Sequence, residues 1–232
     1  MAKEWKKSKS TTQSINEFVE MGHLHNQVLD GWRAPSGESF PDPRASEIVV
    51  FEDFFKRGFR VPVHPFLQGL LLYYDIGICN LHPNSIILVA TFIHLCEAFV
   101  GIEPHFDLFC YLFCMRKKGA VGGSKIAGEV YLHLCDGMKN HYLSCPWNTS
   151  LSEWYKKWFY IQEEPNNVTF CDVGYVPEKR VSWTDRPECA GHVEELMNLI
   201  QWSHLDGSQP PSAAMPEEST PWVRILGELR HD

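Results

Sequence analysis

The stretch 92–119, FIHLCEAFVGIEPHFDLFCYLFCMRKKG, gathers side chains that could bind a metal or act in catalysis. In a helix Cys110 and Cys114 lie one turn apart, and His94 and Glu97 are neighbours in the same way, so two pairs could converge on one ion. Structural zinc sites instead use close pairs of ligands on turns, whereas these residues are embedded among Phe, Leu and Ile. Because a buried cysteine behaves as a small hydrophobe, the pattern favours a helical core, and we predict no metal and no cofactor.

Five acidic residues of the same region are a second candidate, because three carboxylates could form a two-metal site for phosphoryl transfer if the fold brought them together. They are Glu97, Glu103, Asp107, Glu129 and Asp136. A chain with 29 acidic residues offers such trios by chance, and most carboxylates lie on surfaces. The sequence contains no Gly-x4-Gly-Lys-Ser/Thr, no Gly-x-Ser-x-Gly and no His-Glu-x-x-His. We therefore assign no catalytic residue and favour a non-enzymatic chain.

The aromatic run 147–161, WNTSLSEWYKKWFYI, is a third candidate, for nucleic-acid binding. Bases stack on aromatic faces while lysines hold phosphates, so Trp154, Tyr155 and Trp158 with Lys156 and Lys157 could bind a single strand. In the alternative, which we favour, Trp154 and Trp158 lie one helical turn apart as core anchors and the lysines are simply exposed.

The overall charge does not predict tight nucleic-acid binding, since the net charge of −8 leaves no general attraction for phosphates. A local basic patch is compatible with this charge, and the N-terminus supplies a weaker second candidate of four lysines, which are Lys3, Lys6, Lys7 and Lys9. We therefore expect any contact with nucleic acid to be weak. With 44% hydrophobic residues, the 232-residue chain can bury one main core.

The opening MAKEWKKSKS is followed by polar residues and has no apolar run of the length that a secretory leader needs. We therefore expect an intracellular protein, cytoplasmic or nuclear, whose eight cysteines are thiols. The longest apolar segment, 86–100, includes a histidine and a glutamate and is shorter than the roughly 20 residues that span a bilayer. We expect no membrane partner.

Glycine and proline positions, together with the spacing of apolar residues, predict the helices and strands that must position these residues. Residues 1–45 are polar and rich in Gly, Pro and Ser, which predicts a flexible tail. Capping signals predict a short helix at 46–58, and two helices open at Pro65 and Pro83, the second ending at Gly101. A fourth helix starts at Pro104 and ends before Gly119.

After these helices the spacing of the apolar residues changes from a helical to a strand pattern. Residues 130–135 and 141–145 predict an antiparallel β-hairpin turning over 136–140, and 158–162 is ambiguous between helix and strand. Helical spacing returns at 193–200, and 206–220 is a linker. The predicted fold class is α+β, with a mainly helical core of three or four helices, a small antiparallel hairpin and flexible termini. We divide the chain into a tail (1–45), a main domain (46–165), an extension with one amphipathic helix (166–205), and a linker and tail (206–232).

Three segments of the main domain resemble a known family. The runs LHPNSIIL from Leu81, FIHLCEAFVGIEPHFDLF from Phe92, and WFYI from Trp158 are similar to the plant "putative gypsy type transposon" domain, found in transposase-like, retrotransposon-derived proteins. The residues that carry the resemblance most specifically are Cys96, Glu97, Gly101, Pro104, His105 and Phe106. The match covers roughly residues 46–165.

The resemblance implies a structural, gag-like part of a long-terminal-repeat element or a captured host derivative, and it transfers no catalytic residue. We expect an interaction domain that contacts a protein partner or a second copy of itself, with weak nucleic-acid contact. The alternative is a metal-dependent, DNA-processing enzyme, which rests on the family's label and the scattered carboxylates.

Overall fold

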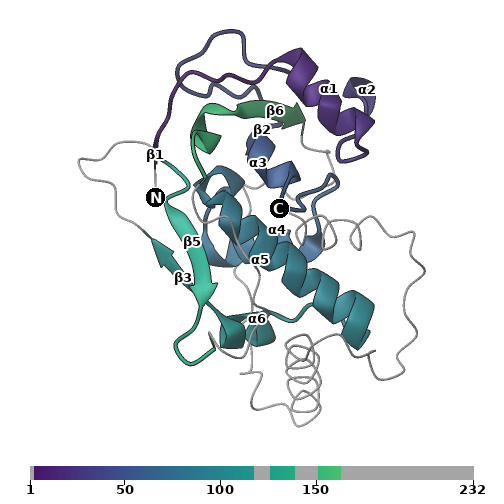
Figure 1. Ribbon diagram of the computed structural model, residues 1–232, viewed down its shortest axis with the longest axis vertical. Helices are drawn as coiled ribbons and strands as arrows, with labels where there is room; N and C mark the ends of the chain where they lie inside the picture. Colours follow the sequence, from purple (N-terminus) through teal and green to yellow (C-terminus); the bar gives the residue numbers. More distant parts are fainter. Residues whose placement is uncertain (1–2, 118–125, 139–150, 163–232) are drawn as a thin grey trace.

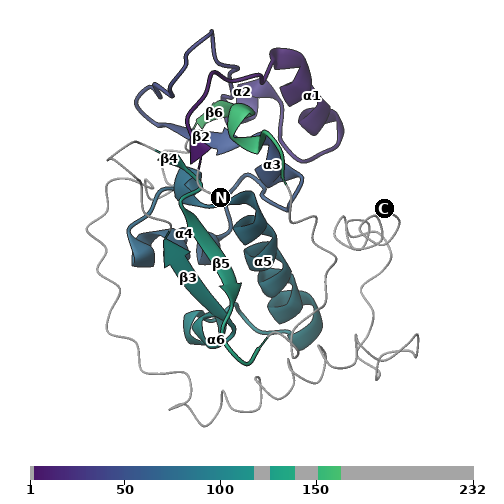
Figure 2. The ribbon, with the colours of Figure 1, turned by 60° about the vertical axis from the view of Figure 1, so that its left-hand side comes forward.

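The computed structural model describes residues 3–117, 126–138 and 151–162. Within these residues it has six α-helices, α1 to α6, and three two-stranded antiparallel sheets, which pair β1 with β4, β2 with β6 and β3 with β5. Figures 1 and 2 show two stacked parts: α1, α2, α3, β2 and β6 form the upper one, and α4, α5, α6, β3 and β5 form the lower one. The fold is therefore of mixed α+β class, as the sequence predicted.

The N-terminal residues are part of this core, so the predicted flexible tail at 1–45 is wrong for the residues described. Helix α1 (Thr12–Glu20) begins at a capping box on Thr11 and buries Ile15 and Phe18. Helix α2 (Gln27–Asp30) is capped by Asn26, and Leu24 and Trp32 on either side of it are buried. Burial of these apolar side chains offsets the entropy of ordering a polar segment.

Residues 47–55 form a strand before they form a helix, which corrects the predicted helix at 46–58. Strand β2 (Glu47–Phe51) pairs with β6 (Trp158–Gln162) from Glu47 opposite Gln162 to Phe51 opposite Trp158. Helix α3 (Glu52–Phe55) follows for one turn. The β-branched run Ile48–Val50 fits a strand that is buried on both faces, and its partner lies too far along the chain for local pattern to reveal it.

The helices that open at prolines are confirmed. Helix α4 (Pro65–Tyr74) and helix α5 (Pro83–His94) both have proline at their first position. Helix α5 continues as a π-helical turn (Leu95–Val100) and stops at Gly101, which has the left-handed conformation that glycine tolerates best. Helix α5 with this turn, Pro83–Val100, is long and apolar enough to cross a membrane by length and composition alone. A buried core helix meets the same criterion, and 44% of this segment is buried inside the protein.

The fourth predicted helix is shorter than expected. Helix α6 (Phe106–Leu112) passes directly into strand β3 (Phe113–Lys117), which pairs with β5 (Val130–Leu134). The first predicted hairpin strand is thus confirmed as β5, but its partner is β3. The second predicted strand, 141–145, and the predicted helix at 193–200 lie outside the described residues.

The remaining elements are short. Strand β1 (Lys3–Glu4) pairs with β4 (Ile126–Ala127), and 3-10 turns cover Ile78–Asn80 and Trp154–Lys156. The ambiguous segment 158–162 is a strand, β6, which lies between β2 and Arg33, because Arg33 exchanges two backbone hydrogen bonds with Tyr160.

One pair of cysteines is bonded, which corrects the expectation of eight thiols. Cys114 in β3 and Cys135 just after β5 form a disulfide with their Cα atoms 5.1 Å apart. Three further described cysteines, Cys79, Cys96 and Cys110, do not take part in this disulfide. The disulfide joins the two strands across a separation of 21 residues.

Histidines cap three of the helices, and His82 is the most buried of them. The Nδ1 atoms of His64, His82 and His105 accept hydrogen bonds from backbone N–H groups two residues on, at 3.1, 3.2 and 3.3 Å. His82 is 9% exposed, and its ring packs against Trp154. Each imidazole satisfies one of the N–H groups that a helix start leaves without a partner.

Replacing His82 tests this cap. We expect His82→Ala to lower the free energy of unfolding by about 1 kcal/mol more than His82→Asn, because the asparagine oxygen can accept the same N–H. Both variants lose the contact with Trp154, so the difference isolates the cap. Urea unfolding followed by circular dichroism measures it. Equal losses of unfolding free energy in the two variants would show that His82 stabilises the protein through packing alone and not through the cap.

Candidate nucleic-acid interface

The N-terminal segment 6–10 lies alongside residues 153–158, almost the whole described chain away in sequence. The Lys9 N–H donates to the Lys156 carbonyl at 2.6 Å, and the Trp158 indole Nε1–H donates to the Lys6 carbonyl at 2.9 Å. Ser8 Oγ donates to the Trp158 carbonyl at 2.5 Å. Figures 1 and 2 both show this end of the chain beside β6. Two candidates that were separate in the sequence therefore meet.

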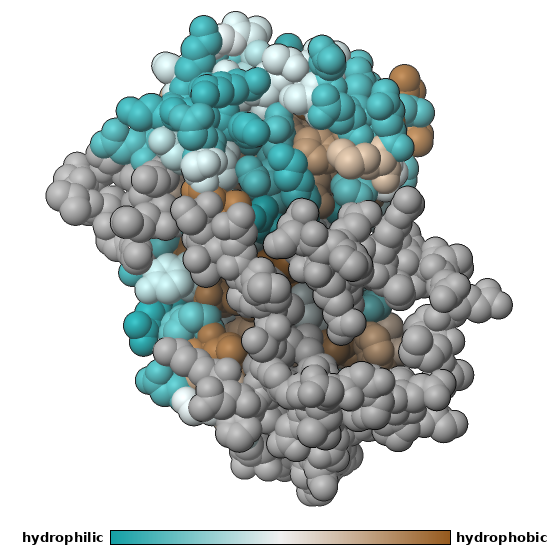
Figure 3. All heavy atoms as spheres, viewed as in Figure 1, coloured by the Kyte–Doolittle hydropathy of each residue, from teal (hydrophilic) through white to brown (hydrophobic). Residues whose placement is uncertain are grey.

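We call the lysines of the two segments the lysine ridge: Lys6, Lys7, Lys9, Lys156 and Lys157. Lys6, Lys7 and Lys9 are exposed, while Lys156 and Lys157 are half-buried. The fourth N-terminal candidate, Lys3, lies in β1. Figure 3 shows that the surface over the upper part of the molecule is mostly hydrophilic on the face in view.

Glu153 connects the two halves of the ridge. Its carboxylate forms ion pairs with Lys156 and, at 2.8 Å, with Lys9. Hydrogen bonds from Lys156 and Lys9 lower the pKa of Glu153 to about 2, so this carboxylate is charged at any physiological pH. Lys9 Nζ and Lys156 Nζ are thereby held near a single point on the surface.

The ridge carries more positive than negative charge. Lys6 pairs with Glu4 at 3.7 Å, so within the described residues five lysines face two carboxylates. Lys7 and Lys157 have no carboxylate partner in residues 3–117, 126–138 or 151–162. Lysines of this kind contact phosphates as point charges without reading the base sequence.

The two tryptophans of the predicted stacking surface are core residues, as the alternative interpretation held, but Trp154 lies in a 3-10 turn and Trp158 in strand β6, so they are not one helical turn apart. Trp154 and Trp158 are 1% and 0% exposed. Trp154 packs edge-on against Phe51 at 4.8 Å between ring centroids, and Trp158 packs against Trp5 at 5.9 Å. Of the five predicted nucleic-acid residues, only Tyr155, Lys156 and Lys157 keep exposed side-chain surface. The burial of both tryptophans therefore leaves no multi-ring stacking surface at these positions.

The residues that carry the family resemblance surround the end of α5. Cys96 is buried, and burial raises the pKa of its thiol to about 12, so it is a neutral core residue. Glu97 in the π-helical turn accepts a hydrogen bond from His64 Nε2 at 2.9 Å, because Nδ1 of that ring is already an acceptor. Gly101 ends the turn, and Pro104 precedes the cap of α6, where Phe106 is buried beneath. These residues shape the α5–α6 connection.

The candidate acidic residues have separate partners. Glu97 contacts His64, Asp107 lies 3.8 Å from His105 Nδ1, and Glu129 lies 3.4 Å from Lys117 Nζ. Within the part of the chain that the structure describes, no three or more His, Cys, Asp or Glu side chains form a group that could hold a metal ion.

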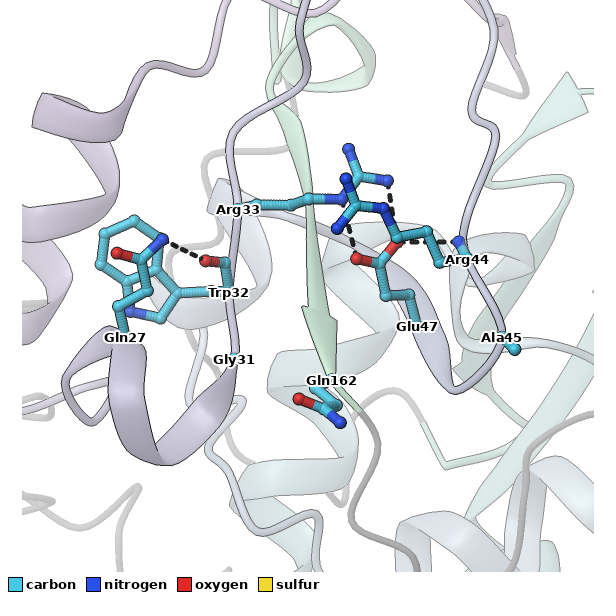
Figure 4. A pocket seen from close by; sticks show the side chains of 8 residues that line it. All are labelled: Gln27, Gly31, Trp32, Arg33, Arg44, Ala45, Glu47 and Gln162. Carbon is cyan, nitrogen blue, oxygen red and sulfur yellow. Dashed lines mark hydrogen bonds and ion pairs between the residues drawn. The ribbon is translucent and has the colours of Figure 1, made fainter.

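A pocket of about 380 Å³ lies on the upper part and was not predicted from the sequence. It is lined by Gln27, Gly31, Trp32, Arg33, Arg44, Ala45, Glu47 and Gln162 (Figure 4). These residues come from α2, from the loop that follows it, from the start of β2 and from the end of β6. The nearest signal in the sequence is the charged PDPR segment at 41–44, which belongs to the predicted flexible tail.

One segment of the chain is similar to a known protein family. Residues 48–117 match the family model described as "Putative gypsy type transposon". No curated protein and no solved structure matches the chain. The matched span runs from β2 to the end of β3 and includes all six residues on which the resemblance rested. Over the segment 48–117 the chain is therefore similar to a gypsy-type transposon domain.

Proposed function

We propose that the chain is a retrotransposon-derived, non-enzymatic interaction domain that binds nucleic acid weakly through the lysine ridge. The observation that supports this proposal most directly is the pairing of residues 6–10 with residues 156–158, which puts two basic segments on one surface. The transposon family of residues 48–117 is consistent with a protein that works close to nucleic acid. An association with protein partners or with a second copy is part of the same proposal.

The expected binding is driven by the release of counterions from the phosphates. Each phosphate contact contributes about 0.7 to the slope of log affinity against log salt on single strands, and about 0.9 on B-DNA. The net charge of −8 opposes approach, so we expect affinities in the micromolar range or weaker at physiological salt. The identity of the bases has little influence on this electrostatic contribution to the affinity.

Removing the two ridge lysines without carboxylate partners tests the proposal. We expect Lys7→Ala/Lys157→Ala to weaken binding to labelled single-stranded RNA and DNA and to reduce the salt slope by about 1.4. Fluorescence anisotropy across a salt series measures both quantities. The matched control is Lys7→Arg/Lys157→Arg, which keeps the charge and should keep the slope. An unchanged slope in the alanine variant would show that the ridge is not the interface.

Glu153 provides a control with the opposite sign. Glu153→Gln removes the carboxylate that occupies Lys9 and Lys156, so both lysines become available to phosphates. We expect tighter binding and a steeper salt slope than in the parent protein. A loss of binding in this variant would mean that Glu153 contributes by ordering the segment and not by competing with phosphates.

The enzyme alternative is tested on the same samples. Mg²⁺- or Mn²⁺-dependent nicking on a denaturing gel, abolished by Glu97→Gln or Asp107→Asn, would replace the proposed function by a DNA-processing one. Glu97 and Asp107 are suitable because neither is buried in the apolar core. Analytical ultracentrifugation of the same protein tests self-association.

A further inference from the structure

The pocket in Figure 4 is built around one partly buried ion pair. Arg33 donates to both carboxylate oxygens of Glu47, from Nε at 2.7 Å and from Nη2 at 2.8 Å. The Arg33 guanidinium also lies 3.7 Å from the centroid of the Tyr160 ring. The side chain of Glu47 is 8% exposed, and hydrogen bonding to Arg33 lowers its pKa. Arg33 and Glu47 therefore hold each other in place as one wall of the pocket.

Arg44 is the guanidinium of the pocket that is left for a ligand. Its backbone N–H donates to Glu47 at 2.8 Å, which fixes its position in the chain. Its side chain is exposed, and within the described residues its charge acts on the nearby Glu47 without forming a side-chain hydrogen bond or a contact ion pair. Figure 4 shows its guanidinium above Glu47, beside that of Arg33. An arginine in this state presents a planar fork of donors.

Gln162 provides donors and acceptors at the opposite edge. It is the last residue of β6, and it lies beside Gly31 in Figure 4. The two residues are so close that a Cβ atom at position 31 would lie 2.4 Å from Gln162 Oε1, and Gly31 has a φ of +56°. Only glycine at position 31 leaves this amide room to line the pocket.

The charges around the pocket decide what kind of ligand fits. Arg33 and Arg44 are balanced by Glu47 and by Glu38, which lies 3.6 Å from Arg33 Nη1. A phosphate would gain little from a site whose charges cancel. A neutral, planar group with both donors and acceptors on its edge can use the arginine fork and the amide together, and unpaired bases are recognised on such edges.

We propose that this pocket receives one unpaired nucleobase and prefers guanine. Arg44 donates its fork to guanine O6 and N7, the commonest specific contact between arginine and a base, and Gln162 contacts a neighbouring edge. The inference deepens the proposed function, since the lysine ridge would hold the strand from which the base projects. Lys7 of the lysine ridge lies near the pocket. A Cβ atom added at Gly37, one residue before Glu38, would lie 3.8 Å from Lys7 Nζ.

The test separates base recognition from phosphate contact. Guanosine and cytidine 5′-monophosphate carry the same phosphate, so their ratio of affinities, measured by titration calorimetry, reports the base alone. Oligo(dT) with and without a single central dG, measured by anisotropy, reports the same preference on a strand. We expect the parent protein to prefer guanine in both assays.

Arg44→Lys keeps the charge and removes the fork, and Gln162→Ala removes the amide. We expect each to reduce the guanine preference, Arg44→Lys by roughly 5- to 100-fold, without changing the affinity or salt slope for plain oligo(dT). Lys7→Ala/Lys157→Ala should lower the affinity and the salt slope for plain oligo(dT) and leave the guanine preference unchanged. Equal affinities of the two nucleotides in the parent protein, or an equal loss for both in Arg44→Lys, would overturn the inference. A guanine preference without any oligonucleotide binding would support the pocket and overturn the proposed function of the ridge.

Discussion

Trp158→Ala is expected to lower the free energy of unfolding by about 3–5 kcal/mol, the usual cost of removing a fully buried large aromatic side chain. Trp158 is 0% exposed, and its ring packs edge-on against Trp5 and Tyr160. The substitution also removes the indole hydrogen bond to Lys6 that holds the N-terminal segment against β6. Because small domains are stable by about 5–15 kcal/mol, the variant should be close to unfolding.

The measurement is urea unfolding followed by tryptophan fluorescence and circular dichroism. Tyr155→Ala is the matched control, since this ring lies three residues earlier and is only half-buried. We expect its loss to be much smaller. If instead Trp158→Ala left the stability unchanged and removed single-strand binding, Trp158 would be a base-stacking residue and its burial in the core would be wrong.

Reducing the disulfide between Cys114 and Cys135 is expected to cost about 3 kcal/mol of stability, from the entropy that the cross-link removes from the unfolded chain. The two cysteines are 21 residues apart, which sets this magnitude. The disulfide joins β3 to β5, a two-stranded sheet that would otherwise depend on packing against α5 and α6. Reduction should therefore loosen the lower part of the molecule first.

Unfolding in urea with and without dithiothreitol checks this result. Cys114→Ser/Cys135→Ser should be less stable than the oxidised protein and insensitive to the reductant. Cys96→Ser is a poor control because that thiol is fully buried, whereas Cys79→Ser changes a half-buried thiol outside the sheet. If oxidised and reduced protein unfold at the same urea concentration, the two cysteines are thiols in solution, as their setting in the sequence had predicted.

Local signals were sufficient for part of the fold. Pro65 and Pro83 predict helix starts, because proline fixes the backbone φ at the first helical position, where an N–H has no partner within the helix. Gly101 predicts the end of the π-helical turn that continues α5. Strand β2 was misassigned because the charged residues around Val49 and Val50 also satisfy helix capping rules. Strand β3 was missed because Phe113 continues the helical spacing of Phe106 and Phe109, and only pairing with β5 overrides it.

The candidate sites depended on pairings that no local pattern contains. The sequence identified Lys156 and Lys157, and separately the N-terminal lysines, but not that the two groups meet. It interpreted Trp154 and Trp158 correctly as core anchors because aromatic residues of this size are usually buried. Arg44 was hidden in a segment rich in proline and glycine, where a polar composition normally indicates a loop without a binding role.

The position of β6 in the chain has a consequence for synthesis. This strand is among the last described residues, yet β2, Arg33 and the segment 6–10 all bond to it or to the residues just before it. While the ribosome is translating the first 150 residues, the partners of β6 have no strand to pair with, and Phe51 and Trp5 remain exposed. Pairings of such high sequence separation form late and slowly. Nascent chains of this protein should therefore need chaperone protection until residues 158–162 leave the exit tunnel.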